Sequence, residues 1–424
     1  QTPLNIANRL KENGVNIIGT DPASIDLAEN RKIFGEVLKK LKIPAPQWGT
    51  AFSIDEALDI AKEITYPVLV RPSYVLGGRA MVIVYDAGSL EKYMNEAIDV
   101  SPERPVLIDR YLQRAEEFDV DAVADGVDVV VGGIMQHIEH AGVHSGDSAC
   151  ALPPFDTPAE HIETMRRHTH ALARGLDVVG LMNVQYAIYQ DEVYVIEVNP
   201  RASRTVPFVS KAIGRPLAKI AARVMVGKSL REQDFTEEIV PNHVSVKEAV
   251  LPFMKFPGAD SLLGPEMKST GEVMGIGPDF GTAFLKAQIG AGSVLPASGR
   301  IFISVADCDK EEVVPVARGL CEAGFELVAT QGTRDFLNSH DIEAESVLKV
   351  HEGRPHIEDA IRSRQVGLII NTPLDESSQY DDFVVRRAAV MNNVPYTTTM
   401  AGARAAVAGI EALQRADLSV QALQ

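Results

Sequence analysis

The spacing of apolar residues changes along the chain, and this change divides it into two regions. In the first region, helix-like and strand-like stretches follow one another irregularly. The predicted helices cover residues 3–13, 24–41, 53–64, 158–175 and 216–226. The predicted strands cover residues 15–19, 68–71, 81–84, 106–110, 119–124 and 129–137. Such a mixture, with an antiparallel component, indicates an α+β domain.

Glycine and proline become frequent from about residue 227 to 295, and we expect this stretch to close the first domain and lead out of it. After Gly292–Gly299 the pattern becomes a regular alternation of short apolar strands and helices. The strands are predicted at 301–305, 325–329, 346–350, 366–371 and 394–398, with helices between them that include one capped by Asp309 and a last one from Gly402. This alternation predicts a small α/β domain with a doubly wound parallel sheet.

An apolar run on each side of a polar turn at residues 190–192 predicts a β-hairpin over residues 185–201. Side chains alternate faces along a strand, so Glu197 and Asn199 should point the same way, and Gln185 can join them from the partner strand. Hard oxygen ligands of this kind suit Mg²⁺ or Mn²⁺, held together with nucleotide phosphates.

Two arginines, Arg201 and Arg204, follow the hairpin directly. Cations and arginines together indicate phosphoryl transfer, where catalysis is mainly positioning and charge neutralisation. The alternative is a surface hairpin with incidental charge. We expect Ile196 and Val198 to lie on the buried face, which makes that alternative weaker.

Further segments of the first region have features of a nucleotide site. Arg71 ends a strand before a Gly-Gly loop that could lay backbone N–H groups over phosphates, although such hairpins are common. Leu112 could pack against an adenine, and Glu117 could accept from ribose hydroxyls. His137, His140 and His144 allow zinc as an alternative, but no Cys or HExxH pattern accompanies them, so a loop that hydrogen-bonds a nucleotide is favoured.

Small polar residues end the strands predicted in the second region: Thr330-Gln-Gly-Thr333, Lys349 and Asn371-Thr372. Ligands of doubly wound sheets bind at these ends, so a phosphate pocket is one interpretation and ordinary turns are the other. No Walker sequence occurs. We interpret Gly275–Gly281 as a turn, because it misses the dinucleotide fingerprint and is not predicted to lie between a strand and a helix.

Composition narrows the class of protein. The chain has 41 basic and 58 acidic residues, a net charge of −17, and no basic patch, which disfavours nucleic-acid binding. Three cysteines without a CxxC pair suit a reducing cytoplasm. No apolar run is long enough to predict a transmembrane helix. Because the chain starts at Gln1 and enters a helix directly, we expect it to be a piece of a longer polypeptide.

Four segments together resemble an ATP-grasp domain, and more closely the large subunit of carbamoyl-phosphate synthetase. They are Arg71–Met81, Gly142–Cys150, Gly180–Gln185 and Ile196–Lys211, and the segment Lys349–Pro355 adds specificity. The resemblance is to the C-terminal half of that subunit. It implies a remnant of a pre-ATP-grasp domain at 1–22, the ATP-grasp unit with its connector at 23–292, and a regulatory domain of methylglyoxal-synthase-like fold at 293–424.

The resemblance implies that this half phosphorylates carbamate with ATP to give carbamoyl phosphate, a step of pyrimidine and arginine biosynthesis. Gln185, Glu197 and Asn199 would hold Mg²⁺ or Mn²⁺, with K⁺ as a further candidate. The catalytic residues would be Arg71, Asn199, Arg201 and Arg204, of which Arg201 and Arg204 would hold carbamate and the transferring phosphate. The nucleotide would be bound by Arg31, Arg71, Arg110, Leu112, Glu117, Gly142, Val143, His144 and Ser145, together with Gln185 and Glu197.

The resemblance also implies two effector sites. Lys349, Thr330, Thr333 and Asn371 match a nucleoside-monophosphate pocket, although Pro373 stands where the family has a second threonine. Glu139, Asp147, Glu248, Tyr396 and Thr398 match a site for ornithine, where acids suit an amine ligand.

The family's partners are an N-terminal synthetase half, which makes the carbamate, and a glutaminase small subunit. Since that half is absent, we expect only the partial reaction from this chain, namely ATP synthesis from ADP and carbamoyl phosphate. Two alternatives stay open. One is another ATP-grasp ligase or carboxylase, and the other is a catalytically silent regulatory or assembly module.

Overall fold

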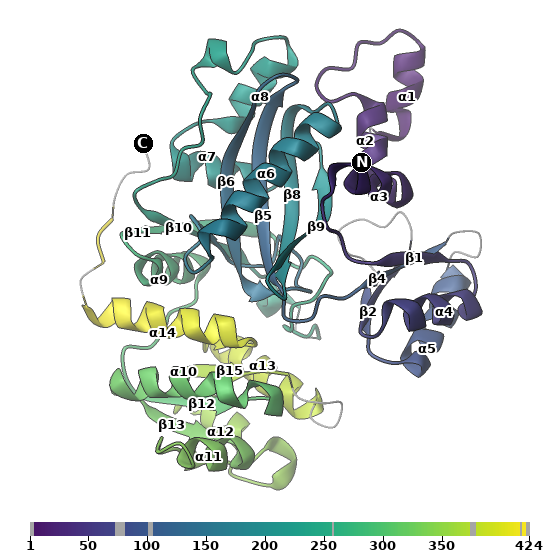
Figure 1. Cartoon of the computed structure of the whole chain (residues 1–424). Coiled ribbons are helices and arrows are strands. Elements are labelled where there is room, and N and C mark those ends of the chain that lie inside the picture. The colour runs from purple at the N-terminus through teal and green to yellow at the C-terminus, as the bar shows by residue number, and fades with distance from the viewer. Residues whose placement is uncertain are drawn as a thin grey trace.

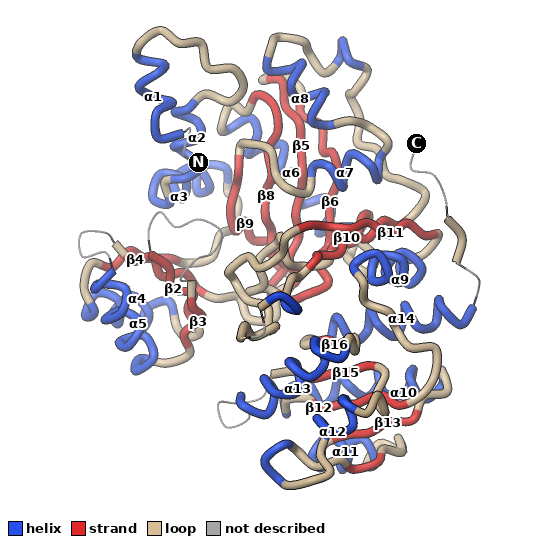
Figure 2. Tube along the Cα trace, turned by 180° about the vertical axis from the view of Figure 1, so that it is seen from behind, coloured by secondary structure: helices blue, strands red, loops and turns tan. Residues whose placement is uncertain are grey.

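The protein is described here from a computed structural model, which covers residues 4–72, 81–100, 105–256, 258–373, 379–415 and 418–420 (Figure 1). An N-terminal helical segment and a small lobe flank a large central sheet, and a second α/β unit lies beyond it (Figures 1 and 2). Among the described helices, none is both long enough and apolar enough to cross a membrane.

The chain opens with helices α1 (Leu4–Glu12), α2 (Pro22–Glu29) and α3 (Arg31–Leu41). The strand predicted at 15–19 is wrong, because this stretch is irregular, with Val15 and Ile18 exposed. The single helix predicted over 24–41 is broken at Asn30, which is extended. Its side chain accepts from the backbone N–H groups of the next helix, so this residue ends one helix and caps the other.

The small lobe is an antiparallel sheet in the order β1-β4-β2-β3, packed against two helices. Its strands are β1 (Trp48–Ala51), β2 (Val68–Pro72), β3 (Val82–Val84) and β4 (Val106–Arg110), and its helices are α4 (Ile54–Ile64) and α5 (Ala87–Val100). The core between this sheet and its helices is apolar. At the end of β4, Asp109 pairs with Arg31 of α3, and Arg110 lies near Tyr189 of the central sheet.

The central sheet is antiparallel in the order β11-β10-β7-β6-β5-β8-β9. Its strands are β5 (Glu116–Asp125), β6 (Val129–His140), β7 (Cys150–Leu152), β8 (Val179–Tyr189), β9 (Glu192–Asn199), β10 (Val244–Val250) and β11 (Gly271–Gly277). Helices α3 and α6 (Ala159–Gly175) bury one face (Figure 1). Helices α7 (Val206–Ile213) and α8 (Leu217–Met225) bury the other.

The Gly- and Pro-rich region contains more regular structure than expected. Besides β10 and β11, it holds α9 (Phe280–Ala291) and the short 3₁₀ turns η1 (Arg231–Gln233) and η2 (Phe253–Lys255). Gly275–Gly281 therefore does lie between a strand and a helix, and its interpretation as a simple turn is wrong. The glycines allow close packing: a Cβ on Gly275 would lie 2.1 Å from the carbonyl oxygen of Ala283 in α9.

The C-terminal unit is a parallel sheet in the order β14-β13-β12-β15-β16, so the doubly wound prediction is confirmed. The strands are β12 (Arg300–Ser304), β13 (Glu326–Ala329), β14 (Glu345–Ser346), β15 (Leu368–Asn371) and β16 (Tyr396–Thr397). The intervening elements are η3 (Asp307–Asp309), α10 (Lys310–Glu322), α11 (Gln331–Asn338), η4 (Val350–Glu352), α12 (Ile357–Arg362), α13 (Gln379–Asn392) and α14 (Met400–Arg415). Asp309 precedes α10 but makes no side-chain cap, because its carboxylate pairs with Arg114.

Helix α14 packs on α9, so one apolar cluster runs from the central sheet into the C-terminal unit (Figure 2). The cluster joins Ile138 and Val246 to Phe284 of α9 and to Ile301 of β12. The approach is close, because a Cβ on Gly281 would lie 2.4 Å from the carbonyl oxygen of Ala408. The domain boundary near residue 292 stays a prediction. The apolar cluster just described extends across this boundary.

Gly281→Ala tests this junction. The added methyl group cannot avoid the backbone of α14, and overpacking costs about 1–3 kcal/mol, so we expect the thermal unfolding midpoint to fall by several degrees. Gly290→Ala in the same helix is the control, since its Cβ would meet Val273 at an ordinary 3.4 Å. Equal midpoints for both variants would contradict the tight junction.

Candidate functional site

The predicted hairpin is present as strands β8 and β9, but its pairing is irregular. Gln185 pairs with Glu197, whereas the next residue, Tyr186, pairs with Val195. Ile196 is the extra residue of a β-bulge. The bulge shifts the alternation of β9 by one position, which keeps Glu197 opposite Gln185.

This bulge separates two residues that were expected on the same face. Val198 is 4% exposed and belongs to the core beneath α6, as predicted. Ile196 instead packs partly buried beside Leu112 and Ala187, so its predicted place on the buried face is wrong. The reason is the added residue, which rotates Ile196 away from the core.

The structure brings the three predicted metal ligands together with their neighbours. The Asn199 Nδ2 donates to Glu197 Oε1 over 2.7 Å, and the Gln185 Nε2 donates to the hydroxyl of Ser145 over 2.9 Å. Arg201 donates to the side-chain oxygen of Asn199 over 3.1 Å. A carboxylate and two amide oxygens on two adjacent strands, all partly exposed, are a donor set that fits a hard divalent cation.

Two predicted arginines share one carboxylate that the sequence reasoning missed. Arg31 donates to the carbonyl oxygen of Ile196 over 2.9 Å and to Asp109 over 2.5 Å. The Arg71 Nε lies 3.2 Å from the other oxygen of Asp109. Asp109 is 5% exposed and lies next to the last residue of the apolar strand β4. An acidic residue in an otherwise apolar run is the sequence feature that could have identified it. Asp109 therefore ties the small lobe to the bulge.

The Gly-Gly loop predicted to cover the phosphates falls in residues 73–80, which lie outside the described residues.

The two arginines after the hairpin are held differently. Arg201 is exposed and turns back to Asn199. Arg204 reaches the segment before β11: its Nε lies 3.4 Å from Glu272, and its Nη1 donates to Ser269 over 3.4 Å. Arg201 therefore lies beside the oxygen ligands, whereas Arg204 is held by the segment that leads into β11.

Several of the predicted nucleoside contacts gather beside the bulge. Leu112 packs with Ala187 in a small apolar cluster that Ile196 joins. The guanidinium of Arg110 lies 6.0 Å from the ring centre of Tyr189. Burial raises the pKa of Glu117 to about 7.

The loop after β6 is fixed by backbone geometry. Gly142 has a φ of +105°, and a Cβ there would lie 2.5 Å from the hydroxyl of Tyr111. His144 accepts at Nδ1 from the backbone N–H of Gly146 over 3.0 Å. Val143 and Ser145 complete this loop, and Ser145 links it to Gln185.

A buried polar network lies under these strands. Asn183 donates to Asp119 over 3.1 Å and to Asp121 over 2.9 Å, and His137 contacts Asp119 at 3.0 Å. Burial raises the pKa of Asp121 to about 6, although three side chains donate to it. Lys247, fully buried, donates to the carbonyl oxygen of Ser148. These residues were not predicted, although polar residues at alternate positions of an apolar strand signal such a network.

The five residues matched to an ornithine site line one cavity of about 250 Å³ between the central sheet and the C-terminal unit: Glu139, Asp147, Glu248, Tyr396 and Thr398. Burial raises the pKa of Glu248 to about 8, and the nearby Glu139 adds to this shift. Asp147 is already satisfied by the backbone N–H groups of Lys268 and Ser269.

The second predicted effector pocket is only partly assembled. Thr330 and Thr333 lie at the end of β13, within 3.4 Å of each other, and Asn371 ends β15. Lys349 was expected at a strand end, but β14 stops at Ser346 and Lys349 precedes the 3₁₀ turn η4. The prediction missed Lys310, which begins the helix after the central strand β12 and so stands at the same edge.

The histidine alternative finds no support among the described residues. The part of the chain described brings three His, Cys or carboxylate ligand atoms within 4.8 Å of one another only at Glu160, His161 and Asp191. His137 and His144 have the partners given above.

Two family models and several curated relatives match this chain. A family model described as the carbamoyl-phosphate synthase L chain ATP-binding domain matches residues 30–233, and one described as an MGS-like domain matches 312–398. The carbamoyl phosphate synthase large chain of Acidobacterium capsulatum is 56% identical over 432 residues, and that of Archaeoglobus fulgidus is 56% identical over 425. The chain belongs to the carbamoyl-phosphate synthase large-chain family.

Each of these alignments covers 100% of this chain, but only 39% and 40% of the two large chains. This member of the carbamoyl-phosphate synthase family thus spans about two fifths of the length of the curated relatives it matches. The 30–233 match contains the bulge, the oxygen ligands and the arginines.

Solved structures support the ATP-grasp architecture of this carbamoyl-phosphate synthase family chain. A biotin carboxylase domain of Hydrogenobacter thermophilus 2-oxoglutarate carboxylase, in complex with MgADP and bicarbonate, aligns with 20% identity and a TM-score of 0.55. Campylobacter jejuni biotin carboxylase aligns with 16% identity and a TM-score of 0.56. Both cover 68% of this chain and 71% of the other, and at such identity they show the fold alone.

The raised pKa of Glu248 predicts a pH-dependent stability. The folded chain holds this proton up to about pH 8, whereas the unfolded chain loses it near its usual pKa, so this group lowers stability as pH rises through that window. Glu248→Gln removes the titration. We therefore expect its thermal midpoint, relative to the wild type, to increase from pH 5.5 to 8.5. The control Glu343→Gln changes an exposed acid and should give a constant difference. A constant difference for Glu248→Gln would contradict the shift.

Proposed function

We propose that this chain phosphorylates carbamate with ATP, giving carbamoyl phosphate and ADP. The observation that carries this proposal is the oxygen ligand set of the bulged hairpin (Gln185, Glu197 and Asn199), with Arg201 bonded to Asn199. Arg204 follows three residues later in the chain. The family relationship adds the substrate class.

In the proposed reaction a carbamate oxygen attacks the γ-phosphorus of ATP. The new P–O bond forms as the bond from the γ-phosphorus to the bridging oxygen of ADP breaks. The nucleophile is already an anion, so no side chain needs to remove a proton. The chain's tasks are alignment and neutralisation of charge on the equatorial oxygens.

Each group of residues has a task in this scheme. Arg201 and Arg204 hold carbamate and the transferring phosphoryl group, since planar guanidinium groups match both. Arg71 approaches the phosphates. Arg31 holds the small lobe, which carries Arg71, against the bulge. Leu112 and Glu117 contact the nucleoside. Mg²⁺ or Mn²⁺, when bound by Gln185, Glu197 and Asn199, would supply charge neutralisation between the β- and γ-phosphates. K⁺ is a further candidate ion.

We further propose that the chain works in the cytoplasm with an N-terminal synthetase half and a glutaminase subunit, for pyrimidine and arginine biosynthesis. The short coverage of its relatives supports the first of these partners. Its C-terminal unit would bind a nucleoside monophosphate at Thr330, Thr333, Lys349 and Asn371. The junction cavity would take ornithine, whose ammonium groups suit Glu139 and Glu248.

Glu197→Gln tests the metal and phosphate site. With Mg²⁺, ADP and carbamoyl phosphate, the wild-type chain should form ATP, and the variant should do so at least about 100-fold more slowly, because a charged ligand near the transferring group is lost. Glu192→Gln in the same strand is the control, since its carboxylate lies at the hairpin turn and accepts from the exposed hydroxyl of Tyr194. Nucleotide binding with no ATP formation by the wild type would favour a silent module instead.

Ornithine binding tests the junction cavity. Glu248 must lose its proton to pair with an ammonium group, so affinity should increase from pH 6.5 to 8.5 and binding should release a proton. Isothermal titration calorimetry in two buffers of different ionisation enthalpy measures both effects. Absence of ornithine binding at either pH would remove this proposal.

A further inference from the structure

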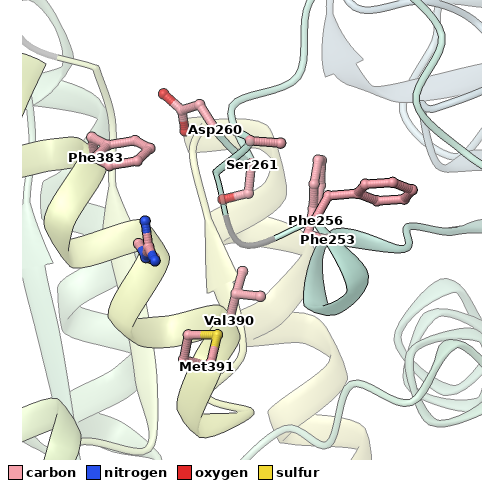
Figure 3. Close-up of a pocket in the computed structure, with 9 residues that line it drawn as sticks. Phe253, Phe256, Asp260, Ser261, Phe383, Val390 and Met391 are labelled. Carbon is pink, nitrogen blue, oxygen red and sulfur yellow. The ribbon is translucent and has the colours of Figure 1, made fainter.

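The segment between β10 and β11, described at residues 251–256 and 258–270, lies against helix α13 of the C-terminal unit. Figure 3 shows Asp260 and Ser261 of the segment near Phe383, Val390 and Met391 of the helix. The cavity left between them measures only about 10 Å³, about enough for one water. This small gap lies beside the larger junction cavity, which Phe253 and Ser261 of the segment and Val390 of the helix also line.

A bidentate ion pair joins the surfaces. Arg386 of α13 is 3% exposed and donates from Nε and Nη2 to the two carboxylate oxygens of Asp260, over 3.0 and 2.8 Å. Burial favours the neutral acid, but this guanidinium lowers the pKa of Asp260 below its usual range. Paired forks of this kind fix orientation as well as distance.

From Asp260 a continuous set of hydrogen bonds leads through the segment. The backbone N–H of Leu262 donates to the Asp260 carboxylate over 3.0 Å. The Lys268 ammonium group donates to the carbonyl oxygen of Leu262 over 2.8 Å, and to that of Asp260 over 3.4 Å. The backbone N–H groups of Lys268 and Ser269 both donate to Asp147, which anchors this end on the loop after β6.

The far end of the segment holds Arg204. Its Nη1 donates to the hydroxyl of Ser269, which itself donates to the carbonyl oxygen of Gly146 over 3.0 Å. Its Nε faces Glu272 at the start of β11. This guanidinium is therefore directed by Met267, Ser269 and Glu272, and the neighbouring Lys268 joins their segment to Asp260 and Leu262.

One helical turn earlier, α13 also contacts the strand ends of the C-terminal sheet. Asp382 lies one helical turn before Arg386 and accepts from the Asn371 side chain over 2.9 Å. Residues four apart lie on one face of a helix, so a displacement of Asp382 moves Arg386 with it. Asn371 belongs to the proposed nucleoside-monophosphate pocket.

We propose that Asp260 and Arg386 are positioning residues: their ion pair sets the segment that orients Arg204, and so makes the phosphate site depend on the position of α13. This inference rests on the proposed function, in which Arg204 holds carbamate and the transferring phosphoryl group.

The test compares Asp260→Asn and Arg386→Lys in the full chain by ATP formation from ADP and carbamoyl phosphate. Each variant keeps the approximate size of the side chain but removes the bidentate pair. We expect the KM for carbamoyl phosphate to rise about tenfold, and the KM for ADP to stay within twofold, because the nucleoside contacts lie on other elements. Arg362→Lys is the control and should change neither, because this exposed arginine pairs with Glu358 of its own helix α12.

Hydrogen–deuterium exchange provides a readout that needs no activity. In both variants the amides of Lys268 and Ser269 should exchange faster, while those of β8 and β9 stay as in the wild type. If Arg386→Lys fails to fold, Asp260→Asn alone tests the inference. The Asp260 side chain is 37% exposed, so we expect this variant to keep its fold. Equal changes in both KM values, or unchanged exchange at 268 and 269, would overturn the inference. A wild type that forms no ATP would instead count against the proposed function, and the exchange result would still decide the coupling.

Discussion

The β-bulge at Ile196 is the feature on which the site depends. It keeps Glu197 paired with Gln185 while Val195 pairs with Tyr186, so the core side chains and the oxygen ligands both reach their places. It also presents the carbonyl oxygen of Ile196 to Arg31. Through Arg31 and Asp109 the small lobe, which carries Arg71, is held against the same hairpin. Regular pairing would place either the valines or the ligands on the wrong face.

Much of the architecture follows from local patterns in the sequence. The short apolar strands after residue 299 predict the parallel doubly wound sheet, and the polar turn at 190–192 predicts the hairpin, because both are set by neighbouring residues. The same rule of alternation predicts Glu197 and Asn199 on one face. These features require no knowledge of which strands pair.

The failures have a common physical cause. The bulge depends on the register of two strands, so alternation alone misplaced Ile196. Helix α9 lies in a glycine-rich stretch, where the glycines permit contact with β11 and α14 that only the folded chain makes. Asp109 also gains its role only when two distant arginines meet it. Tertiary contacts decide each of these cases.

The central claim is that the bulged hairpin gathers a divalent cation against a nucleotide. A crystal structure with ADP and Mn²⁺, with anomalous diffraction data at the manganese edge, tests it most directly. The account predicts a manganese peak about 2.0–2.3 Å from oxygens of Glu197, Asn199 and Gln185, beside the diphosphate. A peak at Glu160, His161 and Asp191 instead, with none at the hairpin, would contradict it.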